Sequence, residues 1–163
     1  MFDMDAFREF REGLMLLRDG DAAAAAEMLR RALERDPHNP FYISYYGLSV
    51  GHADGDWDSA ERLCHTAVCR HRRQAQLYLN LAEVYLASGR RRAAADTLAR
   101  GLQRLPHDIR LHTEFGRLIL RRRPVLHFLP RTNLLNRHLG RLRHQLLLCI
   151  PRRKWLAPSE SRA

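Results

Sequence analysis

Small and apolar residues recur along the first two thirds of the chain at intervals of 34 or 35 positions. Four sets of residues share this interval, and they are Gly13, Gly47, Ala82 and Gly116; Gly20, Gly55 and Gly89; Ala25, Ala60 and Ala94; and Ala32, Ala67 and Gly101. Leucines such as Leu29, Leu63 and Leu98 lie between them at helical spacing. The pattern predicts an all-α repeat protein in which each unit is two helices joined by a tight turn.

The ends of the predicted helices carry matching turn residues. Gly20, Gly55 and Gly89 follow the first helix of each unit, where a left-handed cap favours a residue without Cβ. Asp21 and Asp56 come next and can cap the second helix, whereas Arg90 cannot. We place the units at 6–39, 40–74 and 75–108, with a partial fourth unit at 109–123.

These features resemble the tetratricopeptide repeat, a 34-residue helix-turn-helix. The third unit matches it through Leu81, Ala82, Tyr85, Gly89, Ala94, Leu98, Gly101 and Pro106, and the first through Gly13, Gly20, Ala25, Leu29, Ala32 and Pro37. The second unit has one extra residue near His52–Asp54, and Arg72 stands where the others have proline. The resemblance implies that residues 1–123 form a right-handed α-solenoid of about seven helices; it does not fix a function.

In such solenoids the first helices of the units line a concave face that binds partners. The resemblance places these peptide-groove candidates on that face: Phe7, Phe10, Leu14, Phe41, Tyr45, Leu48, Gln76, Asn80, Glu83, Arg110 and Arg117. The face would grade from aromatic to polar and basic, which suits a peptide. The alternative for Phe7 and Phe10 is a purely structural role in the core.

The family's carboxylate clamp, which holds the C-terminal tails of heat-shock chaperones, requires lysine, arginine and asparagine in this row. Phe10, Leu14, Tyr45 and Gln76 occupy four of those places, and Asn80 alone could serve. The sequence therefore argues against that partner.

The charge is distributed unevenly along the chain. Residues 1–99 hold 13 basic and 15 acidic side chains, whereas residues 100–163 hold 15 basic and three acidic ones. We expect residues 124–163 to form a linker, a basic amphipathic capping helix and a tail. In the alternative, the basic C-terminal third binds an anionic surface, membrane lipid or nucleic acid, through Arg121, Arg122, Arg123, Arg137, Arg141 and Arg143.

The sequence offers no support for catalysis. The nine histidines form no HExxH pair, and no phosphate-binding glycine loop is present. Cys64, Cys69 and Cys149 make no CxxC pair, so we expect buried reduced thiols, no metal, no cofactor and a cytoplasmic protein. The acidic start and the short apolar run at 146–150 predict neither a signal peptide nor a membrane span.

The most favoured function is a non-enzymatic protein-protein interaction module, either an adaptor or a chaperone-like peptide binder. Its partner would be another protein or peptide, and no small-molecule substrate is expected. The length and the three units are also similar to small tetratricopeptide chaperones of bacterial type III secretion, although those lack a basic C-terminal third. That likeness favours a bacterial scaffold protein.

Overall fold

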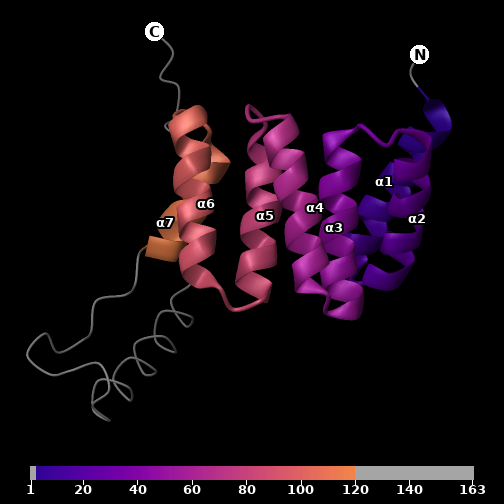
Figure 1. The fold of residues 1–163 in the computed structure, drawn as a ribbon, viewed down its shortest axis with the longest axis horizontal. Coiled ribbons are helices and arrows are strands. Elements are labelled where there is room, and N and C mark those ends of the chain that lie inside the picture. The colour runs from indigo at the N-terminus through magenta and orange to yellow at the C-terminus, as the bar shows by residue number, and fades with distance from the viewer. Residues whose placement is uncertain (1–2, 120–163) are drawn as a thin grey trace, which may run out of the picture. The chain divides into compact units, whose positions relative to one another are not determined.

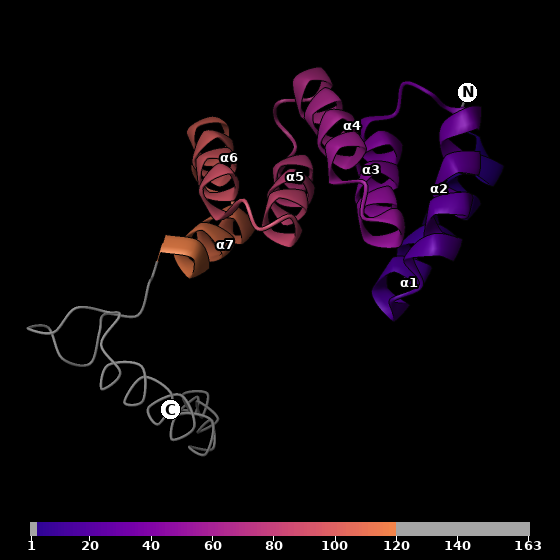
Figure 2. The same cartoon turned by 60° about the horizontal axis from the view of Figure 1, so that its bottom comes forward.

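The computed structural model describes residues 3–119, which form seven α-helices and no strand. The helices are α1 (Met4–Asp19), α2 (Ala22–Arg35), α3 (Pro40–Asp54), α4 (Trp57–Arg70), α5 (Ala75–Ala87), α6 (Arg91–Arg104) and α7 (Ile109–Ile119). They follow one another in chain order, as Figures 1 and 2 show. The predicted all-α architecture is confirmed, with three helix pairs and the first helix of a fourth.

The helices are arranged in two layers. Each helix packs against its neighbours in sequence, and α1, α3, α5 and α7 also contact one another in succession. Among the described helices, α2, α4 and α6 make no such contacts with one another. The first helices of the units therefore form one continuous face, which we call the inner face, and the second helices form the outer layer.

The predicted turn chemistry is confirmed at each of the three helix-helix turns within a unit. Gly20, Gly55 and Gly89 have φ values of 90°, 71° and 78°, in the left-handed region that glycine adopts without strain. The carboxylates of Asp21 and Asp56 each accept a hydrogen bond of 3.0 Å, from the backbone N–H of Ala24 and Ser59.

The recurring small residues allow neighbouring helices to approach closely. A Cβ added at Gly13 would lie 2.6 Å from Leu29 Cγ, and one added at Gly47 would lie 2.8 Å from Leu63 Cβ. Ala25, Ala60 and Ala94 are all completely buried on the facing helices. At Gly116, by contrast, an added Cβ meets no described atom within 4 Å.

The core is largest in the second and third units. One cluster of buried residues runs from Leu48 on α3 through Leu81 and Leu98 to Leu111 on α7. A smaller cluster of Ala6, Ala32 and Tyr42 joins α1 and α2 to α3, and a third joins α3, α4 and α5. These clusters fix the first helices, which carry the inner face, against the second helices of the outer layer.

Two sequence predictions on the thiols have different outcomes. Cys64 is buried, as predicted, but Cys69 is exposed, because it lies five residues further along α4 and points away from the core. Cys149, the predicted linker, capping helix and tail, and the basic residues Arg121 to Arg123, Arg137, Arg141 and Arg143 all lie outside the described residues. No helix between residues 3 and 119 is long and apolar enough to cross a membrane.

Candidate functional site

Aromatic side chains occupy the inner face where α1 meets α3. The Phe10 ring lies 4.8 Å from the ring of Tyr42 and 5.5 Å from that of Tyr45, the second pair edge to face. Phe10 and Tyr45 are half-buried, whereas Tyr42 belongs to the core. Phe10 therefore supports the core and still offers part of its ring to the surface.

A hydrogen-bonded chain continues this face across α3, α5 and α7. The Asn80 amide Nδ2 donates to Ser44 Oγ at 3.0 Å, and Asn80 Oδ1 accepts from Gln76 Nε2 at 2.8 Å. Gln76 Oε1 in turn accepts from Arg110 Nη1 at 3.2 Å. Asn80 is 1% exposed, so it holds the first helices in register and offers almost no surface of its own.

Tyr45 joins the aromatic part of the inner face to the polar part. Burial raises the pKa of its hydroxyl and the Glu83 carboxylate adds to the rise, while a hydrogen bond with Asn80 and the Arg110 charge oppose it. The phenol is neutral at physiological pH already at its ordinary pKa of 10, and the shift goes in the direction that keeps it so. A half-buried neutral tyrosine presents an apolar ring and a polar tip to a ligand.

A hollow of about 300 Å³ lies on the inner face where the C-terminal halves of α1 and α3 approach α5. Its walls come from Leu17, Gly20, Ala22, Leu48, His52 and Glu83. Leu48 is 5% exposed and forms an apolar floor, and His52 Nε2 lies 3.3 Å from Glu83 Oε1 at the rim. The hollow can accept a small apolar side chain beneath a polar rim.

At the α7 end of the face, the two predicted arginines form ion pairs. Arg110 is paired with Asp108 at 3.2 Å, and Arg117 with Glu114 at 2.6 Å. Both acids lie within three residues of their partners along the chain, so the charges are largely neutralised locally. Among the described residues, the face thus grades from aromatic side chains to ion-paired polar ones, and the predicted role of Arg110 and Arg117 in a peptide groove stays a prediction.

Three of the remaining candidates lie at the edges of the inner face. Phe41 is half-buried against two core clusters, and Leu14 is half-buried on α1. Phe7 is 37% exposed and lines a shallow hollow whose described residues all belong to α1, Met4 and Met15 among them. The structure therefore brings together Phe10, Tyr45, Gln76, Asn80 and Arg110, and places Phe7 apart from them.

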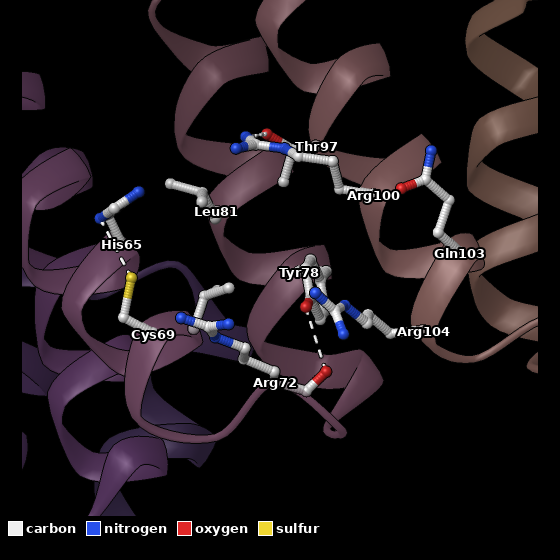
Figure 3. Close-up of a pocket in the computed structure, with 10 residues that line it drawn as sticks. His65, Cys69, Arg72, Tyr78, Leu81, Thr97, Arg100, Gln103 and Arg104 are labelled. Atoms are coloured by element: carbon white, nitrogen blue, oxygen red, sulfur yellow. Dashed lines mark hydrogen bonds between the residues drawn. The ribbon is translucent and has the colours of Figure 1, made fainter.

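Sequence reasoning missed a further depression, which lies between α4, α5 and α6 and which we call the outer cleft. It has a volume of about 260 Å³ and is lined by His65, Val68, Cys69, Arg72, Tyr78, Leu81, Thr97, Arg100, Gln103 and Arg104 (Figure 3). The one trace of it in the sequence is Arg72, which replaces the closing proline of the other units.

Stacked helix pairs with glycine turns and a continuous inner face define an α-helical repeat protein. Residues 52–113 match the family model described as "Tetratricopeptide repeat". This segment therefore contains tetratricopeptide repeats, which confirms the resemblance drawn from the sequence. No curated protein sequence matches the chain significantly.

Solved structures of tetratricopeptide domains share this fold at low sequence identity. The first such domain of Spaghetti (RPAP3), bound to the HSP90 peptide SRMEEVD, is 18% identical with a TM-score of 0.59, over 72% of this chain and 95% of that one. The TPR2B domain of yeast Sti1, in a complex with pHsp70, is 17% identical with a TM-score of 0.61, over 71% and 94% of the two chains.

One similar structure belongs to an enzyme. The O-GlcNAc transferase of Thermobaculum terrenum is 25% identical with a TM-score of 0.60, and the match covers 72% of this chain but 23% of the transferase chain. The likeness thus concerns the repeat part of that enzyme.

Proposed function

We propose that this chain is a non-enzymatic peptide-binding module, an adaptor or chaperone-like protein, that uses its inner face. The observation that carries the proposal is the unbroken row of contacts from Phe10 through Tyr45 and Asn80 to Gln76 and Arg110, which spans all four first helices. The similar domains of Spaghetti and Sti1, which were solved with heat-shock protein partners, support the same use of the fold.

The inner face suits a peptide with an aromatic or aliphatic anchor better than an acidic tail. Phe10 and Tyr45 offer ring surface at one end, and the hollow over Leu48 accepts a second apolar group. Arg110 and Arg117 already face carboxylates of this chain. A chaperone tail such as SRMEEVD would therefore find fewer free cations here than its binding mode requires.

The proposal is tested by selecting peptides on the full chain and measuring their affinity for single variants. Replacing Tyr45 with alanine should weaken binding by about 1–3 kcal/mol, since a few anchor residues carry most of an interface. Tyr46→Ala is the matched control, because Tyr46 lies on the same helix and lines a hollow with α4 residues instead. Melting temperature is measured on each variant.

Two further variants separate binding from folding. Phe41→Ala should mainly lower stability, by about 3–5 kcal/mol, because the ring packs on two core clusters. Unchanged peptide affinity in a stably folded Tyr45→Ala, Gln76→Ala double variant would remove the inner face as the binding site.

Binding of an anionic surface by the basic C-terminal third remains a prediction. It is based on the excess of basic residues in that part of the sequence. Binding through phosphates weakens steeply between low and physiological salt, whereas binding to an apolar groove changes little. A pull-down from the native host at two salt concentrations separates the two functions. The cytoplasmic and bacterial assignments likewise stay predictions.

A further inference from the structure

The outer cleft is enclosed by three elements of the second and third units. α4 contributes His65, Val68 and Cys69, and the turn before α5 contributes Arg72. Tyr78 and Leu81 of α5 form its floor, and Arg100, Gln103 and Arg104 of α6 form the opposite wall. Figure 3 shows His65 and Cys69 on one side and Gln103 and Arg104 on the other, with Tyr78 between them.

Positive charge gathers in this cleft. Three arginines line it, and none of the described residues that line it is acidic. Arg100 donates to Thr97 Oγ1 at 3.1 Å, but the guanidinium groups of Arg72 and Arg104 have no hydrogen-bond or ion-pair partner between residues 3 and 119. Arg100 and Arg104 stand four residues apart on one helix face, where like charges repel. An anion between the walls would relieve this repulsion.

The turn that carries Arg72 is held in place by the floor of the cleft. The Tyr78 hydroxyl donates to the backbone carbonyl of Arg72 at 3.0 Å. Tyr78 is 5% exposed and Leu81 is 1% exposed, so both are fixed in the core cluster. Together with Val68 they give the cleft an apolar inner surface below its cationic rim.

We propose that the outer cleft binds a small organic anion, a phosphate or carboxylate attached to an apolar group, between Arg72 and Arg104. Planar guanidinium groups bind the oxygens of both anions in pairs, which fixes their orientation. The apolar floor receives the uncharged part, and the volume of about 260 Å³ limits the ligand to a small one. This site is separate from the inner face and does not depend on peptide binding there.

Cys69 supplies a local measure of occupancy. Its thiol is exposed and lines the cleft, with Sγ 3.6 Å from His65 Nδ1. A ligand seated in the cleft should cover the thiol and slow its alkylation. The Cys69 peptide is resolved by mass spectrometry, so the measurement reports this site even if anions also bind elsewhere on the chain.

The experiment follows iodoacetamide labelling of Cys69 in the full chain with and without phenyl phosphate, and again with benzoate or inorganic phosphate. We expect phenyl phosphate and benzoate to slow labelling, and inorganic phosphate to do so less because it lacks an apolar part. Arg72→Gln and Arg104→Gln should each weaken the apparent affinity roughly tenfold, since each removes a charge-assisted hydrogen bond. Arg92→Gln, at an exposed arginine of α6 outside the cleft, is the matched control.

Two results would overturn the proposal. One is labelling that none of the three probes slows at millimolar concentration. The other is equal protection in the wild type and in a folded Arg72→Gln, Arg104→Gln double variant. Rates are compared as the ratio without and with the probe in each variant, so that a changed reactivity of the thiol itself cancels.

Discussion

At the scale of single residues, the distance between paired helices is decided by whether a Cβ can fit. Gly47→Ala would place its methyl group 2.8 Å from Leu63 Cβ and 3.1 Å from the Ala60 carbonyl oxygen. We expect a loss of about 1–3 kcal/mol in the free energy of unfolding, because overpacking forces the helices apart. Urea denaturation followed by circular dichroism measures it.

Gly116→Ala provides the opposite case in a helix interior. Its added methyl group meets no described atom within 4 Å, so the gain in helix propensity should raise stability by up to about 1 kcal/mol. The same denaturation experiment measures both variants. A loss at position 116 as large as that at position 47 would contradict the prediction.

The sequence predicted the small residues at helix contacts, because a small residue that recurs at the same place in each unit indicates that two helix backbones lie close together there. It did not predict that Cys69 is exposed or that Asn80 is almost completely buried. Both follow from the direction in which a side chain leaves its helix and from contacts made with another unit, such as Asn80 with Ser44. Spacing along the chain does not specify these contacts.

At the scale of elements, a side-chain cluster joins α4 to the turn before α6. Glu61 Oε1 accepts from the Tyr85 hydroxyl at 2.7 Å, and Glu61 Oε2 accepts from Arg90 Nη1 at 2.6 Å. The Arg90 guanidinium also lies 5.0 Å above the Tyr85 ring. Arg90 cannot cap α6, as predicted, but it fixes the start of that helix through Glu61 instead.

This cluster predicts a pH-dependent contribution to stability. The hydrogen bond from Tyr85, and then the bond and charge of Arg90, lower the pKa of Glu61, although burial opposes this shift. Burial, followed by Glu61 itself, raises the pKa of Tyr85 to about 12, so the phenol remains a donor. Because the folded pKa of Glu61 lies below its ordinary value of 4.5, its contribution is present above that pH and is lost as the pH falls through the folded value.

Glu61→Gln should therefore lower the free energy of unfolding by about 1 kcal/mol at pH 7. The difference from the wild type should shrink below about pH 4.5, where the carboxylate becomes protonated. Urea denaturation at a series of pH values measures it, with Glu12→Gln on the exposed surface of α1 as control. A difference that is constant from pH 3 to pH 7 would show that the charge of Glu61 plays no part.

At the scale of the described solenoid, stability is expected to vary along the stack. α5 contributes six of the 13 buried residues of the largest core cluster, more than any other described helix, whereas α1 buries two residues, Ala6 and Gly13. Met4 and Met15 leave 69% and 54% of their surface exposed on α1. Because repeats interact mainly with their neighbours, opening should begin in a helix that buries few residues, such as α1.

Native-state hydrogen exchange should thus show the slowest amides in α5 and adjoining parts of α4, and faster exchange in α1. Mass spectrometry of peptides from each helix measures the gradient in the full chain. Equal protection in α1 and α5 would mean that the first unit opens only with global unfolding.

The fold as a whole could be predicted from the sequence, because each unit repeats the same turn glycine and the same small residues at helix contacts. The inner row could be predicted in outline, since Phe10, Tyr45, Gln76 and Arg110 all stand on the predicted face of successive first helices. The ion pairs of Arg110 and Arg117 were not predicted, although Asp108 and Glu114 lie only two and three residues away, because spacing does not specify which way these long side chains turn. The outer cleft was not predicted because its walls come from different units and no repeated residue marks them.

The two thiols of α4 give this protein an internal reference for opening. Cys64 donates to the Ser44 carbonyl oxygen at 3.2 Å and is fully buried, and burial raises the pKa of its thiol to about 12. Cys69, five residues later, is exposed in the same folded chain. In the unligated protein, the ratio of the two labelling rates is independent of protein concentration and reagent age. It reports how often α3 separates from α4 in a single sample, without any added dye or engineered probe.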